Sequence, residues 1–184
     1  TMSPMAPRLP NSLWRPLGAK AFALTFHNWY GLRVKILRAF GASVNPTARV
    51  RPSARISCPW NLTLGHEATI GDLAVIESEE PVSIGAFVTV SQFTHLCTQR
   101  LWPGGPGPAP ISIGHDGWIG AEAFVGPGVR VGPGAILGAN SSAFDDLDEW
   151  TIYGGDPIRR LKDRPRLPPL PAGVEPGGVL AAAE

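Results

Sequence analysis

A hydrophobic position recurs among polar and small residues along this chain with a period of six residues. From Val44 onward an aliphatic residue or alanine returns at every sixth position, in five groups of three. The fifteen positions are Val44, Val50, Ile56, Leu64, Ile70, Ile76, Ile84, Val90, Leu96, Ile113, Ile119, Val125, Val131, Leu137 and Ala143. Such a repeat predicts short strands wound into a coil of three hexads per turn, with these side chains pointing inward.

The other positions of the hexad suit a tight coil. Glycine follows the aliphatic residue at Gly65, Gly71, Gly85, Gly114, Gly120, Gly126, Gly132 and Gly138. Four residues after the aliphatic position the side chain is small or β-branched, for example at Ala48, Ala54, Ala68, Ala74, Val88, Thr94, Ala123, Val129, Ala135 and Ser141. An antiparallel sandwich would show alternation and hairpin turns instead. The pattern predicts an all-β solenoid over residues 44–152.

The interruptions of the repeat are ordered as well. Each of the three falls between the third hexad of one group and the first hexad of the next, so all insertions leave from one corner of the coil. The longest, residues 97–110, contains the run LWPGGPGPAP and predicts a projecting loop. A loop on a rigid solenoid is a common place for binding or chemistry.

The flanking segments lack the period of six. Residues 1–43 carry aromatic and aliphatic residues at partly helical spacing, which predicts a helical cap over the open end of the coil. Contact of this cap with a membrane surface is the less favoured alternative, because its polar face is not rich in Lys and Arg. Residues 153–184 predict a short basic C-terminal helix, followed from Pro165 by a mobile tail.

Composition narrows the class of protein. With 43% hydrophobic and 17% charged residues among 184, the chain suits one globular domain. A net charge of +1, interpreted as spread along the chain, gives no sign of a nucleic-acid partner. Cys58 and Cys97 fit neither a disulfide framework nor a zinc motif. Polar residues interrupt the apolar stretch 21–37, so no transmembrane segment is expected, and without a signal-peptide pattern we expect a cytoplasmic protein.

Five stretches carry a resemblance to a known family: GLRVKILRAFGA at 31–42, PWNLTLG at 59–65, VSQFTHLCT at 90–98, ISIGHDGWIGAEAFVGPGVRVGPGAILGA at 111–139 and YGGDPIRRLK at 153–162. The chain resembles the hexapeptide-repeat acetyltransferases, and more narrowly their branch in colanic acid and similar exopolysaccharide biosynthesis. The resemblance implies a left-handed parallel β-helix that moves an acetyl group from acetyl-CoA to a sugar hydroxyl. It also implies a homotrimer, with acetyl-CoA in a groove between subunits and a loop histidine as general base.

The projecting loop departs from the family pattern. Leu101 or Trp102 stands where the resemblance implies a histidine, and the loop contains no histidine. A sugar hydroxyl is a poor nucleophile and needs a base that titrates near neutral pH. His95, which strand alternation points outward just before the loop, is the first candidate, and a solvent-facing or interface histidine is the alternative. His115, next to Asp116, is the second candidate.

Six residues are candidates for binding the donor. The resemblance implies that Trp118 lies near the acyl-donor groove, that Gly138 and Ala139 let the pantetheine arm approach the backbone, and that a basic stretch lies near the CoA phosphates. This stretch consists of Arg159, Arg160 and Lys162. The alternatives are an aromatic at a trimer contact, small residues that coil geometry demands, and a solvated basic helix end.

The leading hypothesis is an O-acetyltransferase that acts on a saccharide. The alternatives are an acyltransferase for an amine or secondary metabolite, and a catalytically impaired scaffold subunit. Cys97 is interpreted as structural rather than nucleophilic. No metal site is expected, since the acidic cluster at 145–149 lacks histidine and regular ligand spacing.

Overall fold

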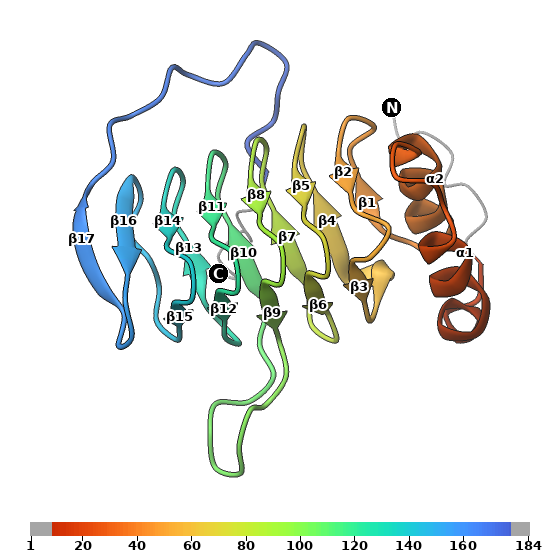
Figure 1. Cartoon of the computed structure of the whole chain (residues 1–184), viewed down its shortest axis with the longest axis horizontal. Helices are drawn as coiled ribbons and strands as arrows, with labels where there is room; N and C mark the ends of the chain where they lie inside the picture. Colours follow the sequence, from red (N-terminus) through yellow and green to blue (C-terminus); the bar gives the residue numbers. More distant parts are fainter. Residues whose placement is uncertain (1–8, 178–184) are drawn as a thin grey trace, which may run out of the picture.

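Fifteen short strands stack into three parallel sheets that form the sides of a solenoid (Figure 1). This computed structural model describes residues 9–177. The first sheet contains β1 (Ser43–Val44), β4 (Leu62–Leu64), β7 (Val82–Ile84), β10 (Ile111–Ile113) and β13 (Arg130–Val131). The second contains β2 (Arg49–Val50), β5 (Thr69–Ile70), β8 (Thr89–Val90), β11 (Trp118–Ile119) and β14 (Ile136–Leu137), extended by β16 (Thr151–Gly154) and β17 (Arg159–Asp163). The third contains β3 (Arg55–Ile56), β6 (Val75–Glu77), β9 (His95–Cys97), β12 (Phe124–Val125) and β15 (Ser142–Ala143).

The core of the solenoid confirms the period of six. All fifteen aliphatic positions are buried, and so are the small residues four positions later. Equivalent residues of successive coils pair in register, for example Val50 with Ile70 and Ile70 with Val90. The glycine after the aliphatic position has a steric cause: a Cβ on Gly65 would lie 2.5 Å from the backbone nitrogen of Ala86 in the next coil.

Short helices close the N-terminal end of the solenoid, as predicted (Figure 1). They are η1 (Asn11–Leu13), η2 (Trp14–Gly18), α1 (Ala19–Ala23) and α2 (Tyr30–Ala39); a further single turn, η3 (Pro59–Asn61), follows β3. Helix α2 packs against β1 and β2 through Val34 and Leu37. Trp14 packs edge-on against Phe22 and Phe40 and donates its indole N–H to the carbonyl oxygen of Ile56 at 2.7 Å. Of the helices in residues 9–177, none is long and apolar enough to cross a membrane.

A fully buried arginine joins the cap to the first coil. Arg33 of α2 donates from Nε to the carbonyl oxygen of Val50 at 2.5 Å. Its Nη1 donates to Thr25 Oγ1 and to the carbonyl oxygen of Phe26, and its Nη2 donates to the carbonyl oxygen of His27. Burial lowers the pKa of this guanidinium. All of its hydrogen-bond acceptors named here are uncharged oxygens. The connection between α1 and α2 is thereby fixed to the solenoid.

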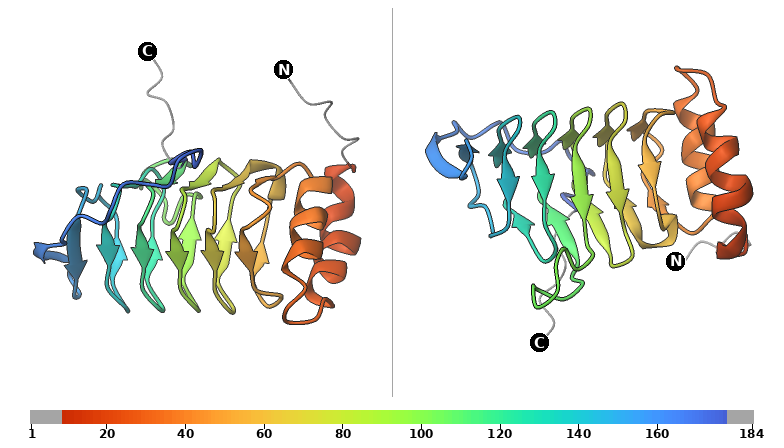
Figure 2. Two further views of the ribbon diagram at one scale, coloured as in Figure 1. Left: turned by 90° about the horizontal axis from the view of Figure 1, so that it is seen from above. Right: turned by 60° about the horizontal axis from the view of Figure 1, so that its bottom comes forward.

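The projecting loop leaves the solenoid where the sequence predicts it. It runs from the end of β9 in the third sheet to β10 in the first sheet, and it projects from the coils in Figure 1 and in the right view of Figure 2. The shorter insertions after β3 and β6 leave from the same corner, between the third and first sheets.

The C-terminal segment corrects one prediction. Residues 159–163 form a strand, β17, that pairs antiparallel with β16, rather than the expected short basic helix. A helix this short is marginal alone, whereas β16 presents an open sheet edge whose backbone groups need partners. Beyond it, the described part of the tail turns back over the coils: Arg164 donates to the carbonyl oxygens of Asp116 and Gly134, and Pro176 accepts from the N–H of Ala86. Whether this tail is mobile stays a prediction, and residues 178–184 lie outside the described residues.

Candidate active site

His95 lies on the outer face of the third sheet, at the base of the projecting loop. Its side chain is 37% exposed, and Nε2 lies 3.1 Å from Oε2 of Glu77. Strands β6 and β9 bring the two together, because Glu77 pairs with Cys97 and Val75 pairs with His95. The distance is that of an ion pair, although Nε2 lacks hydrogen-bond geometry to any acceptor in the described residues. A carboxylate beside an imidazole is an arrangement that supports general base catalysis.

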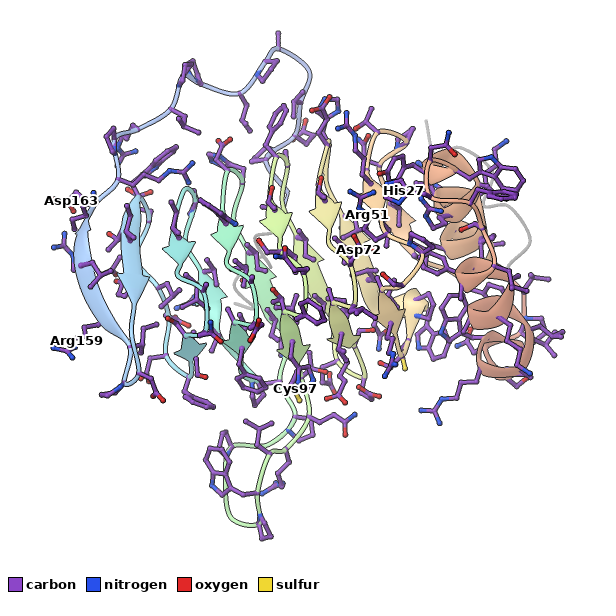
Figure 3. All side chains as sticks on the ribbon, in the orientation of Figure 1. His27, Arg51, Asp72, Cys97, Arg159 and Asp163 are labelled. Carbon is purple, nitrogen blue, oxygen red and sulfur yellow. The ribbon has the colours of Figure 1, made fainter. Side chains whose placement is uncertain are left out.

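Cys97 completes a cluster of three potential ligands. Its thiol donates to Glu77 Oε2 at 3.0 Å, and one ligand atom from each of Glu77, His95 and Cys97 lies within 4.8 Å of the others (Figure 3 labels Cys97). These donor types are ones that zinc accepts, and the sequence did not predict that the three residues lie together. Burial raises the pKa of the Cys97 thiol to about 11, helped by the bond to Glu77. The thiol is therefore protonated at neutral pH, which agrees with the structural interpretation of Cys97.

Glu77 is the site residue that sequence reasoning missed. It follows Ile76 as Cys97 follows Leu96, so the two occupy the same hexad position in successive coils. This equivalence was a usable signal, because residues at one hexad position stack on one face of a solenoid.

Aromatic side chains link His95 to the projecting loop. The ring of His95 contacts Phe124 edge-on with centroids 5.3 Å apart, and Phe124 contacts Phe144 at 5.6 Å. Trp102 of the loop contacts Phe144 edge-on at 6.3 Å. Trp102, one of the two residues at the expected histidine position, therefore packs back against the third sheet.

His115 lies elsewhere, in the turn between β10 and β11. Its Nδ1 is 2.8 Å from Asp116 Oδ2, and its ring faces Trp150 edge-on. Arg164 from the tail donates to the carbonyl oxygen of Asp116, so this side of the turn is covered, and the His115 side chain is 22% exposed. This corner joins the first and second sheets, opposite the third sheet that carries His95. The structure does not bring the two predicted histidines together.

Three of the predicted donor-binding residues share one pocket. Trp118, Gly138 and Ala139 line a cavity of about 310 Å³ beside the second sheet. The Trp118 indole N–H donates to Ser91 Oγ at 2.9 Å, which fixes the ring over the pocket. Ser91 and Gln92 also line the pocket, and the same coil continues from them to His95.

The small residues of this pocket have a structural cause as well. A Cβ on Gly120 would lie 2.5 Å from the backbone nitrogen of Ala139, and one on Gly138 would lie 3.1 Å from the carbonyl oxygen of Tyr153. Coil stacking alone therefore demands glycine at 120, while the wider spacing at Gly138 leaves its alternative, a small residue demanded by coil geometry, open. Within the described residues, the N–H groups of Ala121 and Ala139 make no protein hydrogen bond. They are available to a ligand carbonyl.

The basic residues extend the same sheet. Trp118 pairs with Ile136, Ile136 with Ile152, and Ile152 with Lys162, so these four side chains form one row on one face. Three strand steps separate Trp118 from Lys162, roughly 14 Å. Arg160 pairs instead with Tyr153, beyond a bulge, and Arg159 pairs with Gly154 (Figure 3 labels Arg159). Of the three predicted phosphate contacts, Lys162 has the register that faces the pocket side.

Comparison with known proteins identifies a relative by sequence and solved structures with a similar fold. No protein-family model matches the chain. The chain is 35% identical over 156 residues to WcaF of Escherichia coli (strain K12), which is described as a colanic acid biosynthesis acetyltransferase; the match covers 83% of this chain and 86% of WcaF. A maltose O-acetyltransferase from Clostridium difficile 630 superposes with a TM-score of 0.74 at 21% identity, covering 85% of this chain and 87% of that one. A hexapeptide-repeat acetyltransferase from Vibrio cholerae O1 biovar eltor, complexed with acetyl-CoA, superposes at 0.68 and 24% identity, covering 81% and 86%.

Proposed function

Because the chain belongs to the hexapeptide-repeat acetyltransferase family of colanic acid biosynthesis, we propose that it transfers an acetyl group from acetyl-CoA to a hydroxyl of a saccharide. The observation that carries this proposal is the 35% identity to WcaF over 83% of the chain. The related fold of an acetyltransferase complexed with acetyl-CoA supports the choice of donor. We place the reaction in polysaccharide biosynthesis, as the name of the relative indicates.

The Trp118 pocket is the proposed site of the pantetheine arm and the thioester. Its volume of about 310 Å³ suits part of an extended ligand, and the Ala121 and Ala139 N–H groups would donate to a carbonyl there. Lys162, in the same row of side chains as Trp118, would meet the phosphates. Arg159 and Arg160 would add positive charge at the end of the sheet.

His95 is the proposed general base, with Glu77 orienting it. The imidazole takes the proton as the hydroxyl oxygen attacks the thioester carbonyl, and backbone N–H groups stabilise the oxyanion. The carbon–sulfur bond then breaks, and the CoA thiolate receives the proton from the imidazolium. His95 does not line the Trp118 pocket within one subunit. We therefore propose that a neighbouring subunit completes the site in a homotrimer, the assembly that the family resemblance implies. We also propose a cytoplasmic protein with its two cysteines reduced.

The test is free-thiol release from acetyl-CoA with wild type, His95→Ala and His115→Ala, over a panel of sugar and amine acceptors. We expect sugar-dependent release that falls about 10²- to 10⁴-fold in His95→Ala, the range for losing a general base. His115→Ala, with its own carboxylate partner, is the matched control and should stay near wild type. Preference for amines would contradict the acceptor. Tight CoA binding without turnover would favour the scaffold alternative, which the loop without histidine motivates.

A further inference from the structure

The charges of this chain are strongly segregated. The first 66 residues contain nine of the sixteen Lys and Arg residues, and all fifteen Asp and Glu residues come after them. The expectation that charge is spread along the chain is therefore wrong, because the net value of +1 conceals a basic N-terminal third and an acidic remainder. The basic part comprises the helical cap and the first coil.

The same part of the molecule exposes large apolar side chains. Leu24 is 83% exposed, Phe26 68% and Leu17 60%, and Leu13, Trp29 and Leu32 are also exposed. A groove of about 330 Å³ lies between the segment η1–α1 and helix α2. Apolar residues line it: Leu9, Leu13, Leu17, Ala21, Ile36 and Phe40. Half of the exposed large apolar side chains of the described residues thus lie in this one cap, and a concentration of this kind marks an interaction site.

Helical spacing explains why these side chains face outward. Helix α2 buries Arg33, Val34 and Leu37 against the first coil, so Leu32 lies on its exposed side. The cap also exposes the cations Arg15, Lys20 and Lys35 and has no acidic residue, which corrects the expectation that its polar face is not rich in Lys and Arg.

The apolar connection between α1 and α2 is held rigidly. Buried Arg33 binds Thr25, Phe26 and His27 of this connection, and Phe26 and Trp29 pack edge-on with centroids 4.8 Å apart. The chain thus uses a buried charge to fix a loop whose own side chains point into solvent. Phe26 and Trp29 are therefore presented together, and Leu24 at the start of the same connection is exposed as well.

We propose that the N-terminal cap docks on the surface of an anionic lipid bilayer. Leu24, Phe26 and Trp29 would enter the boundary between headgroups and acyl chains, and the cations of the cap would meet acidic headgroups. A second copy of the cap fits this surface poorly, because it would bring a basic region without any acidic residue against an identical one. A soluble polyanion would satisfy the cations but leave the apolar side chains in water.

Vesicle co-sedimentation tests the proposal with the full chain. Vesicles of phosphatidylglycerol and phosphatidylcholine are compared with pure phosphatidylcholine, at low and high salt. Wild type should bind the anionic vesicles at least tenfold more tightly, and salt should weaken binding. The triple variant Leu24→Ser/Phe26→Ser/Trp29→Ser and the double variant Lys20→Glu/Lys35→Glu should each lose tenfold or more.

Two exposed positions on the solenoid provide matched controls. Leu73→Ser and Arg130→Glu, at 41% residue exposure and 72% side-chain exposure, should bind like wild type. Thermal melting checks that each variant is folded, and free-thiol release with a soluble acceptor should be unchanged, which separates docking from catalysis. Equal binding to both vesicle types, or unchanged binding by the triple variant, would overturn the proposal. A smaller oligomer for the triple variant in light scattering would also overturn it and assign the surface to a contact between copies.

Discussion

The Nε of Arg33 lies 2.5 Å from the carbonyl oxygen of Val50, which joins the helical cap to the inner wall of the first coil. Neither residue alone suggests this contact, since an arginine on a short helix usually faces solvent. Here the guanidinium is completely buried and lies over the Tyr30 ring, 4.9 Å from its centroid. Together with the Trp14 indole on Ile56 and Arg38 on Val44, Arg33 gives the apolar interface between cap and solenoid a set of polar contacts.

Arg33→Met should destabilise the protein strongly. The variant removes the donor to the buried Val50 carbonyl oxygen and Thr25 hydroxyl and to the partly buried His27 carbonyl oxygen, and a buried unpaired acceptor costs about 1–3 kcal/mol. We expect the free energy of unfolding to fall by about 3 kcal/mol in urea titration. Lys35→Met, on the exposed side of the same helix, is the control and should change it by less than about 0.5 kcal/mol. Equal effects of the two variants would mean that the Arg33 contacts contribute nothing.

Two glycines with opposite surroundings should respond in opposite ways. Gly120→Ala places a Cβ 2.5 Å from the Ala139 nitrogen, so neighbouring coils must separate, and we expect a loss of about 2 kcal/mol or more. Gly31→Ala meets nothing within 4 Å and lies in α2, so it should stabilise by up to about 1 kcal/mol. Thermal unfolding of both variants provides the comparison. A neutral Gly120→Ala would show that neighbouring coils separate here at little cost in free energy.

Glu77→Gln should separate an orienting role from substrate binding. If the carboxylate holds His95 for catalysis, kcat should fall about tenfold or more while the KM for acetyl-CoA stays unchanged. Glu122→Gln is the matched control, because it makes the same change at a turn residue outside this cluster. Elemental analysis checks the alternative. Zinc that is present in the purified wild type and absent from Glu77→Gln would contradict a Glu77 that only orients the His95 base, and would identify the cluster as a metal site.

Lys162→Ala should weaken the donor without slowing chemistry. Loss of one phosphate contact costs about 1 kcal/mol, so the KM for acetyl-CoA should rise about fivefold and kcat should hold. Arg159→Ala, at the far end of the same strand opposite Gly154, should have the smaller effect. The reverse order would show that the side-chain row through Trp118 and Lys162 does not mark the path of the ligand.

Ionisation of the Cys97 thiol should lower the free energy of unfolding at alkaline pH. Its pKa is about 11 when folded and 9.0 as a free group, so folding favours the neutral thiol. This stability is present below pH 9 and is lost as the pH rises through 11, by roughly 2–3 kcal/mol in total. Cys97→Ala should lack this component in unfolding curves between pH 8 and 11, whereas Cys58→Ala should retain it. Identical slopes for all three proteins would contradict the burial of the thiol.

The sequence predicted the solenoid because the packing of its core repeats every six residues, and each inward side chain reports on the same environment. The strand β17 was missed because its partner β16 decides its conformation, not the local run of basic residues. The pairing of His95 with Glu77 joins two successive coils, and its only signal in the sequence is the hexad position that Glu77 shares with Cys97. The grouping of Trp118, Gly138 and Ala139 followed from family resemblance, while the charge segregation was hidden in a net value near zero.

Both ends of the solenoid are closed by elements that cannot add another coil. A parallel coil is in principle an endless structure, since its last turn offers the same open edge as every turn before it. Strand β17 reverses direction, and all five of its residues are exposed and mostly charged. A short, charged edge resists pairing with a second molecule. The helices cover the opposite edge, so the architecture that builds fibres elsewhere is limited here to particles of defined length.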